Sequence, residues 1–293
     1  MNIVYVDKPE ASIDICNGTL KIDDRKIPLL LIDTVVFNTN ANLAIKTILK
    51  LTNEGISIAL CRSEQYAIIH GAKAKNSELK AAQYEALNNA LFIAKYLVTE
   101  KIIRHSNSLR QYAIDLKAQR AIKDADLAES IGALRGIEGA FARQYFSEYF
   151  TLIDRGLHNG ARVKRPPTDP ANAMLSYLYS LFYNLLSIRL LTNGFELGIA
   201  YLHTPFRTHN ALASDLMELF RHTINEKVVA LFADKILNKE DFAKKEGVYL
   251  RSDARKRLYP IIKDFWLSLE SQIAIEIARL RKIICDTNRE RSF

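Results

Sequence analysis

The sequence has few of the features that mark disulfide-rich, secreted or membrane proteins. Among its 293 residues are only three cysteines, Cys16, Cys61 and Cys285, at wide spacings. An odd number so widely spread suggests neither a disulfide framework nor a zinc site, and a reducing cytoplasm is the expected location. No window approaches about 18 uncharged apolar residues, so we expect no membrane span. Residues 1–10 lack the charged and apolar segments of a signal peptide.

The composition is that of a folded protein with a surplus of positive charge. Apolar residues make up 48%, which is ample for a core, and the formal net charge is +8. Net charge is evidence about partners rather than about fold. A balance of this size is typical of nucleic-acid-binding proteins, and a merely basic surface explains it equally well.

Short strand-like runs dominate the first seventy residues. Alternating segments at 12–16 and 19–22 flank the pair Asn17-Gly18, which is the strongest short-range signal of a β-hairpin. A helical pattern at 40–55 ends at Gly55, a residue suited to a C-cap. We expect further strands at 2–6, 27–37, 56–61 and 66–70.

Strand signals nearly vanish after about residue 75. The small, polar and basic stretch at 71–78 is interpreted as a linker, and two later breaks occur at 158–170 and 238–250. Helical patterns occupy 79–120, 126–150, 171–192, 209–237 and 255–287. The predicted fold class is α+β, with a small N-terminal β-rich domain followed by a larger all-α C-terminal domain. The predicted ranges are 1–72 for the β-rich domain, 73–82 for the linker and 83–293 for the helical domain.

The predicted helix at 209–237 carries two acidic residues beside its apolar stripe. The stripe consists of Leu212, Leu216 and Leu219. Asp215 lies on the shoulder of this stripe, roughly 40° from the last leucine, and Glu218 is its neighbour three residues on. Two carboxylates repel each other strongly when dehydrated, so either a cation compensates them or one of them stays protonated. Arg207 or Arg221 at the surface would be the simplest such cation.

Glu138 is a second acid in apolar surroundings. Its neighbours at helical spacing are Leu134, Phe141, Ala142 and Tyr145. An isolated buried carboxylate becomes neutral unless it is paired or bound to a metal. Gly136 and Gly139 flank it, and each costs roughly 1 kcal/mol inside a helix. Two glycines beside a buried acid indicate that a ligand or another part of the structure approaches the helix surface closely. The structural alternative is tight helix–helix packing with an arginine paired to Glu138.

Together, Glu138, His203, Asp215 and Glu218 form a plausible site for a divalent cation. Carboxylate oxygens suit Mg²⁺ or Mn²⁺, and one imidazole favours tolerance of Mn²⁺. Such a cation would stabilise charge on an attacking or leaving oxygen of a phosphate. A lone histidine is also commonly a structural or surface residue, and the spacing of these four residues is not diagnostic by itself.

Basic residues indicate where a phosphate backbone would lie. Arg162, Lys164 and Arg165 occupy a proline-stiffened loop, and Arg207 follows the histidine segment. Side chains of this kind neutralise phosphates without reading the base sequence. We therefore take these four residues as candidate DNA contacts, with a solvated charged surface as the alternative.

Four separated blocks of sequence occur in an order that resembles the CRISPR-associated protein 1 family, over nearly the whole chain. The blocks are GIEGAFARQYF, RPPTDPANAMLSYLYSLF, GFELGIAYLHT and LASDLMELFRH. Members of that family are integrases and endonucleases that insert new spacers into CRISPR arrays, the adaptation step of an antiviral defence. The resemblance implies an N-terminal β domain, a C-terminal helical domain and a homodimer formed mainly through the β domains.

The resemblance also implies roles for the acids. Glu138, His203 and Glu218 would be the metal ligands, of Mg²⁺ or Mn²⁺, and Asp215 would lie beside the metal as an auxiliary catalytic group. The 3′-hydroxyl of a double-stranded DNA would attack a phosphodiester at the CRISPR repeat–leader boundary. Water in place of that hydroxyl would give metal-dependent nuclease activity, and CRISPR-associated protein 2 would bridge two dimers.

Two alternatives and one departure accompany this interpretation. A non-catalytic DNA-binding subunit of the same fold is the first alternative, and a general structure-selective nuclease is the second. The departure concerns Arg104 and His105, which stand where many relatives have Asn-Gln. That segment helps to frame the DNA groove in the family, so the DNA contacts of this segment cannot be carried over from the family to this chain.

Overall fold

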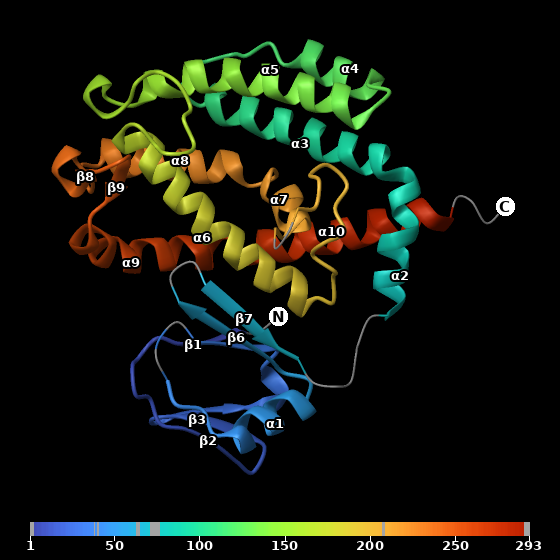
Figure 1. The fold of residues 1–293 in the computed structure, drawn as a ribbon, viewed down its shortest axis with the longest axis vertical. Helices are drawn as coiled ribbons and strands as arrows, with labels where there is room; N and C mark the ends of the chain where they lie inside the picture. Colours follow the sequence, from blue (N-terminus) through green and yellow to red (C-terminus); the bar gives the residue numbers. More distant parts are fainter. Residues whose placement is uncertain are drawn as a thin grey trace. The chain divides into compact units, whose positions relative to one another are not determined.

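The structure is a computed structural model, drawn in Figure 1, that describes residues 3–37, 39, 41–62, 65–70, 77–206 and 209–289. It divides into two compact units. The first unit comprises residues 1–83 and 187–196, and the second comprises residues 84–186 and 197–293. The first is β-rich and the second mostly helical, which confirms the predicted α+β class.

Two sheets build the first unit. One is four-stranded in the order β1-β5-β6-β7, with parallel pairing except between β6 and β7. Its strands are Ile3–Val6, Thr34–Phe37, Ser57–Arg62 and Gln65–Ile69. The other is antiparallel in the order β2-β3-β4, with strands Ile13–Cys16, Thr19–Ile22 and Arg25–Pro28.

The predicted hairpin between β2 and β3 is confirmed. Cys16 pairs with Thr19 across the turn, and both Asn17 and Gly18 have positive φ, of 50° and 69°. Two central residues with positive φ make the tight turn whose twist matches that of paired strands. The core of this unit includes Leu20, which is fully buried. The 3-10 helix η1 (Leu29–Leu31) and helix α1 (Ile45–Asn53) also belong to this unit.

Ten α-helices are described in the chain, most of them in the second unit. Their bounds are α1 as above, α2 Ser77–Glu85, α3 Ala90–Arg110, α4 Gln119–Leu127, α5 Ile131–Tyr149, α6 Pro170–Thr192, α7 Ala211–Met217, α8 Arg221–Ala233, α9 Ser252–Ser268 and α10 Glu270–Arg289. Short 3-10 helices occupy η2 Ala86–Asn89, η3 Phe150–Leu152, η4 Arg155–Leu157 and η5 Lys239–Asp241. Helix α3 packs along α5 and also contacts α8 (Figure 1).

Three predicted helices are divided in the structure. The pattern at 79–120 becomes α2, α3 and the start of α4, and the pattern at 255–287 becomes α9 and α10. The pattern at 209–237 is interrupted at residues 218–220, where backbone N–H groups bond three residues back, as Glu218 does to Asp215 at 3.3 Å. This tighter turn places Glu218 at the junction of α7 and α8 rather than within one helix.

The helical part also contains an element that was not predicted. Strands β8 (Phe242–Lys244) and β9 (Val248–Leu250) form a hairpin within the expected break at 238–250. The N–H of Val248 donates to the carbonyl of Pro167 at 2.8 Å. A Cβ on Gly247 would lie 2.7 Å from the Cβ of Pro166, so only glycine allows this hairpin to approach the loop before α6.

The predicted linker at 73–82 overlaps helix α2, and its limits stay a prediction. Helix α2 begins at Ser77, because the polar start SELK is followed by helix-forming residues. Residues 73–76 lie outside the described part of the chain. Within that described part, no helix combines the length and the apolar character needed to cross a membrane.

Candidate metal centre and nucleic-acid contacts

Glu138 lies on α5 at the border between its buried and exposed sides. Leu134, Phe141 and Tyr145 are buried on the same helix, whereas the side chain of Glu138 is 24% exposed. Its Oε1 accepts a hydrogen bond from Lys101 Nζ. The carboxylate is therefore paired, as the cost of an isolated buried acid requires, but with a lysine rather than an arginine.

Gly136 and Gly139 flank Glu138, and no other element among the described residues covers them. A Cβ at either position would meet no atom of a neighbouring element within 4 Å. Tight helix–helix packing at these two glycines, the structural alternative, is therefore wrong. Close approach of another molecule stays a prediction, and the open side of α5 leaves room for it.

Asp215 is fully buried and its oxygens are saturated with hydrogen bonds. Its Oδ2 accepts the backbone N–H groups of Tyr201 at 2.7 Å and Leu202 at 3.0 Å. Its Oδ1 accepts hydrogen bonds from the backbone N–H and from the ring nitrogen Nδ1 of His203, each with a donor–acceptor distance of 2.8 Å. One carboxylate on α7 thus fixes the whole segment that carries the histidine.

His203 is oriented by this contact. When Nδ1 carries the proton donated to Asp215, Nε2 retains a lone pair. Nε2 lies 3.9 Å from Oε1 of Glu218, and the side chain is 34% exposed. A histidine that donates one ring N–H to a carboxylate and presents its other nitrogen is the usual arrangement of a metal ligand with its supporting group.

Glu218 is buried in the centre of the site between two cations. Its Oε1 accepts a hydrogen bond from Arg221 Nε at 2.8 Å, and its Oε2 forms an ion pair with Lys101. Burial alone would raise the pKa of Glu218, but the positive charges of Arg221 and Lys101 outweigh it and hold that pKa well below its usual range. The carboxylate is therefore ionised, with a positively charged partner on each oxygen.

Lys101 joins the two acids, and the sequence did not lead us to it. It lies on α3, is only 6% exposed, and forms ion pairs with Glu138 and Glu218. Burial opposes its charge, but the two carboxylates more than offset this and raise its pKa. Its neighbours Val98 and Ile102 are fully buried, so a lysine on an apolar stripe was the available signal.

The residues at this site fit a divalent cation, although they do not form a ready-made cluster. Among the described residues, no group of three or more His, Cys, Asp and Glu side chains has the closeness of a metal site. The chemistry of the donors fits Mg²⁺ or Mn²⁺, because two carboxylates contact the same lysine and an oriented imidazole lies beside one of them.

Arg162, one of the candidate DNA contacts, is used inside the protein. Its guanidinium donates to Asn172 Oδ1 at 2.9 Å and Ser176 Oγ at 3.0 Å, and it lies over the ring of Tyr179. Burial is the main cause of its lowered pKa. In this structure Arg162 holds its loop against α6.

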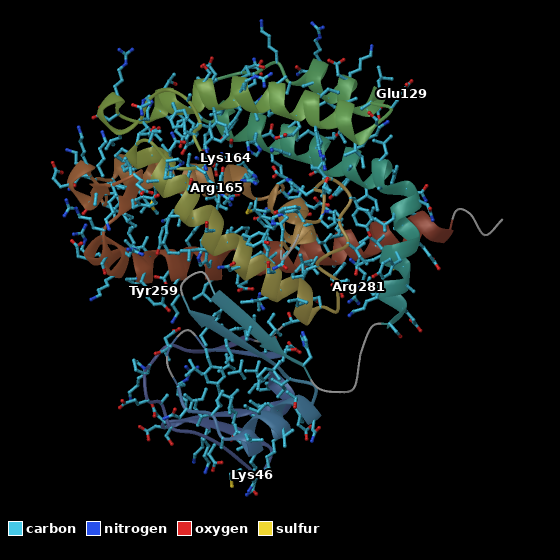
Figure 2. The ribbon with its side chains drawn as sticks, viewed as in Figure 1. Lys46, Glu129, Lys164, Arg165, Tyr259 and Arg281 are labelled. Atoms are coloured by element: carbon cyan, nitrogen blue, oxygen red, sulfur yellow. The ribbon has the colours of Figure 1, made fainter. Side chains whose placement is uncertain are left out.

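The other candidates differ in their accessibility. Lys164 and Arg165 are exposed neighbours on the loop before α6 (Figure 2). Desolvation and the charge of Arg221 lower the pKa of Lys164, which is also within electrostatic reach of Glu218. Arg207 lies outside the described residues. Lys164 and Arg165 are thus the accessible members of this candidate set, and their contact with DNA stays a prediction.

Arg104 and His105, the departure from the family pattern, are interior residues here. Arg104 pairs with Glu100 at 2.9 Å and Glu276 at 2.7 Å, and donates to the carbonyl of Leu219 at 3.2 Å. His105 is 2% exposed. Because Leu219 adjoins Glu218, Arg104 braces the turn that carries the central carboxylate.

Comparison with known proteins extends these observations. The model of the family described as CRISPR-associated protein Cas1 matches residues 4–263. A CRISPR-associated endonuclease Cas1 of Thermodesulfovibrio yellowstonii is 31% identical, over 93% of this chain and 93% of its own length. Both matches include the segments that carry Glu138, His203 and Glu218.

Two solved structures share the fold. A casposase bound to integration product matches with a TM-score of 0.76 at 17% identity, covering 100% of this chain and 92% of that one. A chain in a partial Cas6-RT-Cas1–Cas2 complex matches with a TM-score of 0.77 at 19% identity, covering 99% and 96%. At these identities the likeness concerns architecture alone.

Proposed function

The chain belongs to the CRISPR-associated protein Cas1 family, and from this premise we propose that it is a metal-dependent DNA integrase and endonuclease. It joins the 3′-hydroxyl of a double-stranded DNA to a phosphodiester of a CRISPR array by transesterification, during spacer acquisition. The observation that carries the proposal is the contact of His203 with Asp215, which aims Nε2 toward the ionised Glu218. This pattern is that of a supported metal ligand beside a carboxylate.

Glu138, His203 and Glu218 would hold Mg²⁺ or Mn²⁺. When bound, the cation stabilises negative charge on the attacking and leaving oxygens of a phosphate. Glu218, which contacts Arg221 and Lys101 and lies beside His203, would act as a ligand of the cation. Asp215 fixes the tautomer and the position of His203.

The partners follow from the same premise. The relative from Thermodesulfovibrio yellowstonii is named an endonuclease, and the two structural neighbours are a casposase with integration product and a chain in a Cas1–Cas2 complex. We propose DNA and CRISPR-associated protein 2 as partners, and a homodimer formed through the first unit. Exposed apolar side chains of that unit support dimerisation: Leu30, Leu31, Ile45 and Leu49.

The test is substitution of Glu138. Glu138→Ala should abolish Mn²⁺-dependent joining of a 3′-hydroxyl DNA end into a supercoiled target, because the cation loses a ligand, while DNA binding is retained. Glu129→Ala, at an exposed acid just before the same helix (Figure 2), is the matched control and should join DNA normally. Joining at the wild-type level by Glu138→Ala would overturn the site.

The same assay separates the alternatives. Metal-dependent cleavage by the wild type without joining would indicate a general structure-selective nuclease. DNA binding without cleavage or joining would indicate a non-catalytic subunit of the same fold.

A further inference from the structure

We propose that Lys101 is an internal competitor for the divalent cation and couples cation binding to DNA binding. Its ammonium contacts Glu138 Oε1 and Glu218 Oε2, which belong to the two carboxylates expected to bind the cation. The inference rests on the proposed function, because it concerns the same site. It goes beyond the proposed ligands by giving Lys101 a role, which is to make cation binding depend on DNA binding.

The position of Lys101 is fixed by its surroundings. The residue is 6% exposed, and Leu97, Val98 and Ile102 around it on α3 are fully buried. An ammonium turned toward these side chains would lose its hydration without gaining a partner, which is costly. The two carboxylates are therefore what holds the ammonium in the site.

The charges of Glu138 and Glu218 are balanced without a metal ion. Glu138 and Glu218 contribute two negative charges, and Lys101 and Arg221 contribute two positive ones. Asp215 is already occupied by the backbone and by His203. A divalent cation that enters between Glu138 and Glu218 meets repulsion from Lys101 at close range, in surroundings of low dielectric constant.

A DNA phosphate relieves this repulsion. An ammonium that gives up one carboxylate oxygen to the cation needs another acceptor, and a phosphate oxygen beside the cation supplies one. DNA should therefore strengthen cation binding, and by reciprocity the cation should strengthen DNA binding. Lys101 thus makes the site load its metal together with the substrate rather than before it.

The experiment measures Mn²⁺ binding to the full-length chain, from the electron paramagnetic resonance signal of free Mn²⁺. Lys101→Met should bind Mn²⁺ about tenfold more tightly than wild type, because the competing charge is gone. Lys101→Arg, which keeps the charge, is the matched control and should stay close to wild type. A short 3′-hydroxyl duplex should tighten Mn²⁺ binding in the wild type and much less in Lys101→Met.

Stability supplies a readout that does not depend on activity. In EDTA, Lys101→Met should unfold at a lower temperature, because two carboxylates lose their counter-ion, and Mn²⁺ should raise its melting temperature more than that of wild type. If Lys101→Met does not fold, Lys101→Gln carries the same measurements.

The outcomes separate this inference from the proposed function. If Glu138→Gln weakens Mn²⁺ binding but Lys101→Met leaves it unchanged, the metal site stands and the competitor role of Lys101 is overturned. If the wild type binds no Mn²⁺ with or without DNA, both fall together.

Discussion

Two buried polar residues of helix α3, Lys101 and His105, lie one turn apart and belong to two different polar clusters. The groups of one cluster are charged, and those of the other are neutral. Lys101 belongs to what we term the charged cluster, together with Glu138, Glu218 and Arg221. His105 belongs to what we term the neutral cluster. Its members are His105, Tyr145, Tyr149, Tyr179, His222 and Asn225, connected by hydrogen bonds and ring contacts.

Burial acts differently on the two clusters. In the neutral cluster it prevails: desolvation lowers the pKa of His105 well below its usual value and that of His222 to about 4. In the charged cluster opposite charges prevail over burial, so Glu218 and Lys101 remain ionised. A buried polar residue is therefore not evidence of function by itself. Charge that is kept despite burial is the more informative sign.

Removing the centre of the neutral cluster should have the largest effect, on stability. The side chain of Asn225 accepts from Tyr179 and donates to Tyr145 Oη at 3.0 Å. Asn225→Ala leaves buried hydroxyls without this partner and should lower the free energy of unfolding by about 4 kcal/mol. Urea unfolding measures this, with Asn107→Ala, at an exposed position, as control. Loss of DNA joining in Asn225→Ala without loss of stability would break the distinction between the clusters.

The next effect is a pH dependence of stability that the neutral cluster should show between pH 6.5 and 4. Because the pKa of His222 is about 4 when folded and near 6.5 when unfolded, its contribution is fully present above pH 6.5 and is lost as pH falls toward 4. Across that window the wild type should lose about 3 kcal/mol through this group. Desolvation is the main cause, and the charge of Arg104 adds to it.

His222→Gln should flatten this dependence. Unfolding in EDTA at pH 7, 5.5 and 4.5 measures the difference, and His158→Gln, outside the cluster, is the control. Equal slopes in wild type and His222→Gln would show that His222 is not held neutral by burial.

The third prediction concerns the support of the charged cluster. Asp215→Asn keeps the size of the side chain but removes the charge that orients His203. Supporting groups of this kind typically contribute about 10–100-fold to metal affinity or activity, so Mn²⁺-dependent joining should fall by that factor. Joining kinetics measure the loss, and Asp241→Asn, which affects a buried acid elsewhere, should leave joining unchanged. An unaffected rate in Asp215→Asn would mean that His203 is positioned by other contacts.

The smallest expected effect comes from comparing Arg165, an accessible cation, with Arg162, a cation bonded inside the protein. Arg165→Gln should weaken DNA binding severalfold and reduce the salt slope of the binding constant by about 1, as expected for one lost phosphate contact. Arg162→Gln should instead lower stability, because its guanidinium is bonded to Asn172 and Ser176. Binding titrations at several salt concentrations measure both, and an unchanged slope for Arg165→Gln would place the DNA path elsewhere.

Much of the fold was predictable because its signals are local. Asn17-Gly18 gave the β2–β3 hairpin, since a turn with two positive φ values needs residues of this kind. The β8–β9 hairpin was missed because each strand has only three residues, too few for alternation to be recognised. Its position also depends on Pro166 and Pro167, which are distant in sequence.

The candidate site was predictable as a set of residues but not as an arrangement. Glu138 and Asp215 stood out because acids on apolar stripes are unusual, and Lys101 satisfies the same criterion on α3. Their pairing depends on the packing of α3, α5 and the α7–α8 junction, which no local pattern encodes. The preference for Glu218 over Asp215 as ligand came from family resemblance. The saturated hydrogen bonds of Asp215 now give it a physical reason, although the ligand set itself stays a prediction.

At Gly136 and Gly139 of α5, the residue that favours stability and the residue that favours function are expected to differ. Alanine at Gly136 and Gly139 meets nothing in the isolated chain and should together stabilise the helix by roughly 2 kcal/mol. Directed evolution for heat resistance would therefore accept both changes readily. Evolution for spacer acquisition would reject them if DNA lies against this side of the helix, so the two screens would choose different residues at the same two positions.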